Sequence, residues 1–337
     1  MKSYATYYED NPTYQANTLS AWKTAHPSKH HMDADRLLAA QKVLAQNNHS
    51  ASFLVVRNHH LIWESYFNGA KPNSSMNVHS ISKSIMAALV GIALERGQIA
   101  SLNQPVADIL GHQFKIQDEK RKISIRHLLT MTSGLDWKED VTEYEIERTS
   151  NWLQAIFSLP GTSRPGVRFN YSTGDTHILS AVLTHATGQS LCAFAHEVLF
   201  DPLNIRAAHW GRDKQGYSSG GCNLYLTPRE IATVAALFLQ NGKWNNRLIV
   251  SPSWMQQMWT PQAKVDSKYD YGYLWWILSL GGYPTYKMWG WGGQFVYIMP
   301  SLDLMIVMTS STATEHRDLD GDDFVETYIL PALTVKE

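Results

Sequence analysis

Apolar residues recur at helical spacing in several segments of the chain and gather in short extended runs near both ends. The clearest helical segment runs from about Ser82 to Glu95, and Gly97 supplies a left-handed stop after it. The other helical patterns cover 33–46, 125–131, 151–159, 176–186, 193–200, 228–239 and 323–330. Helix therefore dominates the middle of the chain.

Short apolar runs bounded by turn residues predict two β-hairpins. The first joins 53–56 to 61–63, and the second joins 294–299 to 304–309. Sheet at both ends with helices between predicts an α/β (α+β) fold, in which an antiparallel sheet flanked by helices carries an inserted, mainly helical lobe. We expect one domain over 1–337, made of a sheet lobe at about 33–100 and 221–337, a helical lobe at about 101–220 and an N-terminal arm at 1–32.

Composition excludes several classes of function. The 337 residues carry a net charge of −1 with scattered Lys and Arg, which disfavours nucleic-acid binding. Two cysteines, Cys192 and Cys222, rule out a disulfide scaffold and a four-cysteine metal site. No apolar run of about 18 residues predicts a membrane span. The polar N-terminal segment predicts a cytoplasmic protein, or a periplasmic or secreted one if a signal segment has been removed.

The start of the 82–95 helix carries the first candidate chemistry, Ser80-Ile81-Ser82-Lys83. Ser80 and Lys83 are three residues apart and share a helix face, and the helix dipole stabilises negative charge at the Ser80 oxygen. This pattern predicts an activated serine nucleophile. The alternative is an N-cap serine followed by a solvated lysine, and Ser20 to Lys23 repeats the pattern without an apolar helix behind it.

Two further motifs could complete a serine-based site. Tyr171-Ser172-Thr173 lies on a loop before the 176–186 helix, which Asp175 is expected to cap; a lysine cation beside Tyr171 would ease loss of its proton, so Tyr171 could accept the proton of Ser80. Trp291-Gly292-Gly293-Gln294 opens a strand, and the amides of Ser80 and Gln294 could form an oxyanion hole. Taken alone, each motif also fits a structural turn.

In this order the three motifs resemble the serine β-lactamase and penicillin-binding-protein superfamily, specifically its class C-like esterase and amide-hydrolase branch. Supporting segments are 125–135, Pro165-Gly166 and 224–229, and the resemblance spans about 35–331. It implies a β-lactamase/transpeptidase-like fold with Ser80 as acylated nucleophile, Lys83 as its activator and Tyr171 as general base. The Ser80 and Gln294 amides would bind the oxyanion, and neither metal nor cofactor is implied.

Two departures from the family pattern concern the residues expected to bind substrate, which are Thr173, Trp291, Gly292 and Gly293. Thr173 stands where Asn is usual, and Trp291 stands where a Lys or His would attract a substrate carboxylate. The sequence therefore predicts a serine hydrolase that acts through an acyl-enzyme on small-molecule esters or amides. It does not indicate an oligomeric state.

Three alternatives remain open at this point. The first is a β-lactamase or D-alanyl-D-alanine peptidase, and the second is a penicillin-recognising protein without efficient turnover. The third is an α/β-hydrolase in which Ser218, within Gly216–Gly220, is the nucleophile and His316 its base. The aromatic residues at 269, 271, 273, 275 and 276 could line an acyl pocket, although clustered aromatics favour a core.

Overall fold

The computed structural model describes residues 22–206, 208–311 and 319–334. Its main element is an eight-stranded sheet in the order β2-β1-β13-β12-β11-β10-β9-β8, and all neighbouring strands pair antiparallel. The predicted antiparallel α/β fold is therefore confirmed. In sheet order the strands are His60–Tyr66, Ser50–Arg57, Leu304–Ser310, Gln294–Met299, Tyr283–Gly290, Trp276–Leu280, Asp270–Tyr271 and Ala263–Lys264.

Both predicted hairpins are present, and they lie side by side in the sheet. Asn58 and His59 turn the first hairpin with φ of 47° and 62°, and Asp303 ends the second turn with φ of 45°. Strand β1 then pairs with β13, so that Phe53 lies opposite Met308. The two ends of the chain thereby form one continuous sheet.

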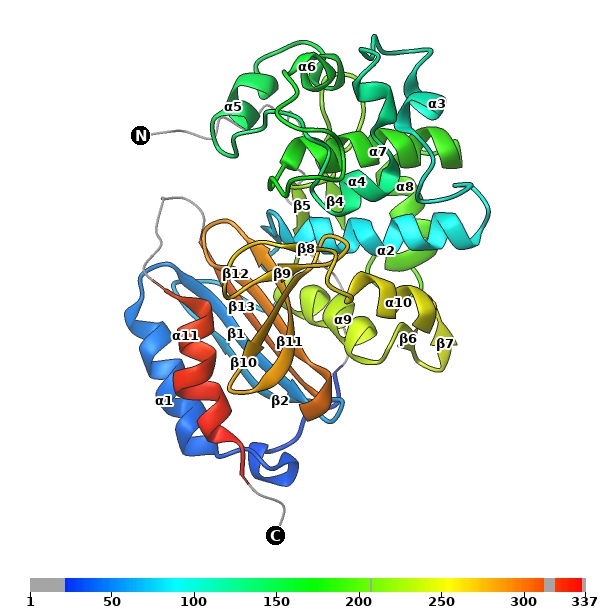
Figure 1. The fold of residues 1–337 in the computed structure, drawn as a ribbon. Helices are drawn as coiled ribbons and strands as arrows, with labels where there is room; N and C mark the ends of the chain where they lie inside the picture. Colours follow the sequence, from blue (N-terminus) through cyan, green and yellow to red (C-terminus); the bar gives the residue numbers. More distant parts are fainter. Residues whose placement is uncertain (1–21, 207, 312–318, 335–337) are drawn as a thin grey trace.

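Helices from both chain ends cover one face of the sheet (Figure 1). They are α1 (Ala34–Gln46) and α11 (Gly321–Phe324), which continues through η5 (Val325–Ile329) and η6 (Leu330–Ala332). Leu37 and Leu44 of α1 lie in one buried cluster with Phe53 and Phe324. Of the predicted N-terminal arm, only 22–32 lies within the described residues, where η1 (Pro27–His30) follows a parallel bridge between Thr24 and Leu61.

The other face of the sheet packs against α2 (Ile81–Glu95), α9 (Pro228–Leu239) and α10 (Pro252–Met258). Helix α2 is buried from Ile81 to Ala93, as its apolar sequence predicts. The indole of Trp254 lies so close to Gly91 that a Cβ there would be 2.1 Å from Nε1, which donates to the Ala87 carbonyl at 3.0 Å. These contacts hold α2 in place.

The segment between α2 and α9 is mostly helical and lies beyond α2 (Figure 1). Helix α7 begins three residues earlier than predicted because Ser172 Oγ accepts from the Asp175 amide, so the expectation that Asp175 is the cap was wrong. Among the described residues no single helix is long and apolar enough to cross a membrane. The elements are α3 (Val106–Leu110), η2 (Lys120–Lys122), α4 (Ile125–Leu129), α5 (Thr142–Glu147), α6 (Trp152–Ser158), α7 (Thr173–Thr187), α8 (Leu191–Ala195) and η3 (His196–Phe200).

Two small sheets complete the fold, in the order β3-β5-β4 and β6-β7. The first matters for the site because the Val78 amide, just after β3, donates to the Leu224 carbonyl at 2.8 Å. It therefore fixes the turn that leads into α2. The strands are β3 (Met76–Asn77), β4 (His209–Trp210), β5 (Leu224–Leu226), β6 (Lys243–Trp244) and β7 (Arg247–Leu248).

Candidate active site

The turn before α2 presents Ser80 at the positive end of the helix. His79 adopts a left-handed conformation with φ of 48°, and the Ser80 side chain makes no capping hydrogen bond. A left-handed conformation is uncommon for a residue with a side chain and marks a constrained backbone. The Ser80 hydroxyl therefore does not serve as an N-cap, and it remains half-buried at the end of a buried helix.

Lys83 is directed into the interior, toward Ser80. Its side chain is 1% exposed, and Nζ lies 2.7 Å from Ser80 Oγ, 2.9 Å from Thr173 Oγ1 and 3.0 Å from the Gly221 carbonyl oxygen. Burial lowers the pKa of Lys83, but Tyr171, Glu139 and other acidic groups outweigh it, so the pKa lies above its usual value. The alternative of a solvated lysine was wrong.

Tyr171 lies next to both groups, with its ring centroid 4.9 Å from Lys83 Nζ. Burial raises the pKa of Tyr171, and this effect outweighs the Lys83 cation and the hydrogen bonds with Ser80 and Lys83, all of which lower it. Lys83 lowers the pKa of Tyr171, as the sequence analysis expected, but the net pKa is raised. The expectation that the phenol ionises more easily was therefore wrong. The resting phenol is protonated.

Glu139 is a neighbour that the sequence analysis missed. Its Oε1 accepts a hydrogen bond from Thr173 Oγ1, and its Oε2 accepts from the Thr173 amide at 3.0 Å and from Trp137 Nε1. Thr173 thus connects Glu139 to Lys83. Glu139 lies 56 positions from Lys83 (139 minus 83) in a loop without a recognisable motif, so no sequence signal could have linked the two.

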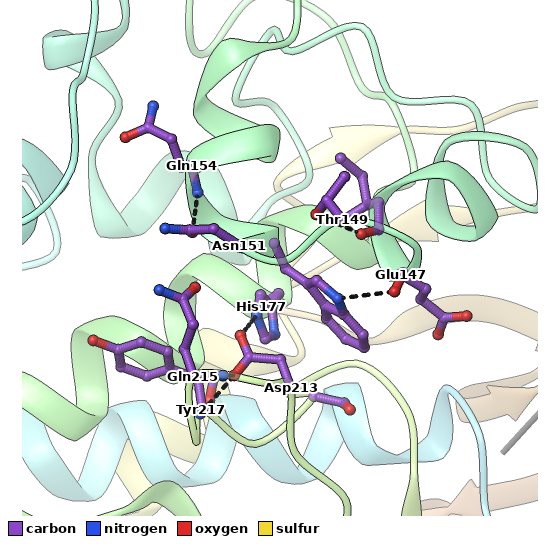
Figure 2. Close-up of polar contacts among 12 residues, drawn as sticks. Glu147, Thr149, Asn151, Gln154, His177, Asp213, Gln215 and Tyr217 are labelled. Carbon is purple, nitrogen blue, oxygen red and sulfur yellow. Dashed lines mark hydrogen bonds and ion pairs between the residues drawn. The ribbon is translucent and has the colours of Figure 1, made fainter. Parts of the chain in front are cut away.

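A braced loop supplies the third partner of Lys83. The buried His177 of α7 contacts Asp213 Oδ2 through Nε2 at 3.0 Å, and Asp213 Oδ1 accepts from the amides of Gln215 and Tyr217 at 2.8 and 2.9 Å (Figure 2). The loop ends at Gly221, where a Cβ would lie 2.3 Å from Thr176 Oγ1 and 3.0 Å from Lys83 Nζ. Only glycine lets this backbone approach Lys83.

The same loop contains Ser218, the alternative nucleophile. Ser218 is 1% exposed, pairs with Arg212 in an isolated bridge, and is followed by the strand β5 and not by a helix. A nucleophile elbow needs a strand before the serine and a helix directly after it. The geometry does not support the α/β-hydrolase alternative, and its proposed base, His316, lies outside the described residues.

The third motif lies beside the Ser80 turn. The Trp291 ring centroid is 5.4 Å from that of His79, and Gly292 and Gly293 turn the chain with φ of 75° and 86°. Gln294 is buried at the start of β12, where its side chain pairs with the Ser310 backbone at 2.7 and 3.3 Å. The role of its amide in an oxyanion hole remains a prediction.

The end of β11 makes a close approach to the nucleophile turn that the sequence analysis did not anticipate. A Cβ at Gly290 would lie 2.5 Å from the Val78 carbonyl oxygen, two residues before Ser80. Gly290 also pairs with Gln294 across the β11–β12 hairpin. Strand β11 and the Ser80 turn are therefore packed backbone against backbone.

An aromatic wall formed by Tyr171, Trp276 and Trp289 extends from the site. Ring centroids are 5.5 Å apart for Tyr171 and Trp276 and 5.3 Å apart for Trp276 and Trp289, which is 37% exposed. The preference for a core was right for Tyr271, Tyr273 and Trp275, which are buried. Trp276 and Tyr269 are half-buried and pack against the buried core, and whether any of these residues lines an acyl pocket remains a prediction.

Comparison with known proteins gives a consistent picture. The family model described as Beta-lactamase matches residues 34–328. The 6-aminohexanoate-dimer hydrolase of Paenarthrobacter ureafaciens is 24% identical over 290 residues, which are 77% of this chain and 72% of that protein. Esterase EstB of Burkholderia gladioli is 29% identical over 146 residues, 38% of this chain and 36% of that one.

Solved structures share the fold. The structure of a putative 6-aminohexanoate-dimer hydrolase from Bacillus anthracis superposes with a TM-score of 0.76 at 21% identity and covers 90% of this chain and 85% of that chain. At this identity the similarity shows the architecture alone. The match of the family model over most of the chain shows more: this protein belongs to the Beta-lactamase family.

Proposed function

We propose that the protein is a serine hydrolase that cleaves small, neutral esters or amides through an acyl-enzyme at Ser80. The observation that carries this proposal is the contact between Ser80 Oγ and the buried Nζ of Lys83 at 2.7 Å, with Tyr171 beside both. A hydroxyl, a buried amine and a phenol in mutual contact are suited to nucleophilic catalysis with proton transfer.

In the proposed reaction Ser80 Oγ forms a bond to the substrate carbonyl carbon. Its proton passes to Tyr171 Oη while the phenol gives its own proton to the leaving oxygen or nitrogen, and the bond to that atom breaks. A water molecule then attacks the acyl carbon and gives a proton to Tyr171 Oη, while the phenol gives its own proton to Ser80 Oγ as the acyl–oxygen bond breaks, which restores Ser80. The amides of Ser80 and Gln294 are proposed to bind the oxyanion.

The surroundings of the site favour neutral substrates. Trp291 stands where a cation would meet a substrate carboxylate, and Lys287 on β11 is 2% exposed and paired with Asp322 at 2.7 Å. The wall of Tyr171, Trp276 and Trp289 offers apolar surface to an acyl or alcohol group. Relatives named as an aminohexanoate-dimer hydrolase and an esterase support hydrolysis of small substrates.

The proposal is tested by steady-state hydrolysis of short-chain p-nitrophenyl esters and of nitrocefin by the wild-type enzyme. We expect ester turnover to exceed nitrocefin turnover at equal concentration. Nitrocefin turnover as fast as that of the best ester would move the assignment to a β-lactamase. A single stoichiometric burst without further turnover would instead support a penicillin-recognising protein.

A further inference from the structure

The hydrogen bonds of Lys83 reveal which of its partners must accept. The Gly221 carbonyl oxygen can only accept, at 3.0 Å. The Thr173 hydroxyl has one proton, which it donates to Glu139, so its oxygen accepts from Lys83 at 2.9 Å. Two N–H groups of Lys83 are thereby committed. Its contacts with Ser80 and Tyr171 remain, and at Ser80 Oγ an ammonium ion donates to the hydroxyl, whereas a neutral amine accepts from it.

Glu139 is held as a carboxylate by three donors. They are the Thr173 hydroxyl, the Thr173 amide at 3.0 Å and the Trp137 indole N–H. Both Glu139 oxygens therefore act as hydrogen-bond acceptors, as carboxylate oxygens do. A fixed negative charge therefore lies one hydroxyl group away from Lys83.

We infer that Glu139 is a positioning residue that keeps Lys83 as an ammonium ion through the Thr173 hydroxyl, so that the Ser80 proton leaves through Tyr171. This inference rests on the proposed acyl-enzyme chemistry and adds a residue to it. It also gives Thr173 a purpose where the family pattern has Asn, because the hydroxyl accepts from Lys83 and donates to Glu139. The Ser80 proton moves to Tyr171 Oη while the phenol passes its own proton to the leaving group, and Lys83 retains its three protons throughout.

The other titratable groups facing Lys83 are uncharged near neutral pH. Burial, together with repulsion from Glu139, raises the pKa of Glu143 to about 8, and burial raises that of Cys222 well above its usual value. Burial and the Lys83 charge lower the pKa of His79 to about 4. Tyr171 is protonated, as described above. Tyr171, Glu143 and Cys222 raise the pKa of Lys83 only in their ionised forms, so near neutral pH Glu139 is the acidic neighbour that hydrogen bonds connect to Lys83.

The test is the pH dependence of kcat/KM for a p-nitrophenyl ester in Glu139→Gln. Loss of the carboxylate lowers the pKa of Lys83, so activity falls at alkaline pH where the wild type keeps it. The ratio of kcat/KM at pH 9.5 to that at pH 7.5 should fall relative to wild type, by about twofold for a drop of one unit from the ordinary lysine pKa of about 10.4 and by more for a larger drop. The shift must persist in a Glu143→Gln background, where Glu143 no longer titrates.

Two further measurements separate this role from a structural one. Glu145→Gln, on the exposed side of α5, is the matched control and should keep the wild-type profile. Thr173→Ser keeps the hydroxyl and should preserve the pH profile of kcat/KM. Thr173→Val removes the hydroxyl and should lower activity. Adding Glu139→Gln to Thr173→Val should then cause little further loss of activity. A Glu139→Gln profile parallel to wild type, or losses that multiply in the double variant, would overturn the inference. Ser80→Ala separates a failure of this inference from a failure of the proposed function. If Ser80→Ala retains activity, Ser80 is not the nucleophile and the proposed function fails.

Discussion

At the scale of single residues, the site depends on three side chains in mutual contact, Ser80, Lys83 and Tyr171. Lys83→Ala and Tyr171→Phe should each reduce kcat for ester hydrolysis by about 10³-fold. The double variant should be little worse than either one, because the Lys83 charge and the Tyr171 proton transfer serve the same step and act as a unit. Purified variants are compared by steady-state kinetics, with circular dichroism as the control for folding. Losses that multiply in the double variant would contradict a shared step.

Trp291 is the residue most directly tied to substrate preference. Trp291→Lys should raise nitrocefin turnover relative to ester turnover by about tenfold, the equivalent of roughly 1.4 kcal/mol of ion pairing recovered in the transition state. Trp291→Phe is the matched control, since it changes the ring without adding charge. An unchanged ratio in Trp291→Lys would separate Trp291 from substrate choice.

At the scale of elements, the position of Ser80 depends on β11 packing against the turn before α2. Gly290→Ala would place a Cβ 2.5 Å from the Val78 carbonyl and must displace backbone. We expect a loss of stability of about 1–3 kcal/mol and a fall in kcat of about tenfold or more, because small misplacements of reacting groups are costly. Thermal unfolding and steady-state kinetics check these two effects. Gly161→Ala is the control, because its Cβ would lie 4.0 Å from the nearest atom, the Gly134 carbonyl oxygen, and it should change neither stability nor kcat.

Local sequence predicted the elements that have strong periodicity. The hairpins at β1–β2 and β12–β13 and the buried helix α2 are where the pattern placed them, because each is defined by its own apolar residues. Strands β10 and β11 were not predicted, since their aromatic and polar residues show no clear alternation. The Glu139–Thr173–Lys83 contact and the Gly221 carbonyl were missed for a different reason: tertiary packing brings together loops that carry no motif.

At the scale of the whole molecule, a buried ion pair joins the C-terminal helix to the sheet. Asp322 of α11 contacts Lys287 of β11 at 2.7 Å and Lys268 at 2.8 Å, and accepts from Tyr297 at 2.7 Å. Burial raises the pKa of Asp322, but the two lysines outweigh it and bring the pKa to about 2. At Lys287, burial lowers the pKa more than the contact with Asp322 raises it, so the pKa lies below its ordinary value. Burying these two charges therefore costs free energy, and removing one partner costs more, because the other charge is left buried without a counter-charge.

Asp322→Asn should therefore lower the free energy of unfolding on the order of 3 kcal/mol at neutral pH, since it leaves Lys287 buried without its counter-charge. The pKa of folded Asp322 lies below its ordinary value, so its contribution is complete above about pH 4 and is lost as the pH falls toward 2. Urea unfolding at several pH values checks both points. Asp323→Asn, at an exposed position, is the control and should keep the wild-type stability and acid sensitivity. If Asp322→Asn lost stability at low pH as the wild type does, Asp322 would not be the source of that acid sensitivity.

The central claim is that Ser80 is the nucleophile of this molecule. Intact-mass analysis after treatment with a fluorophosphonate probe, followed by peptide mapping, tests it most directly. The account predicts one adduct per chain on Ser80, and neither adduct nor ester hydrolysis in Ser80→Ala. An adduct on Ser218, or undiminished labelling of Ser80→Ala, would contradict it.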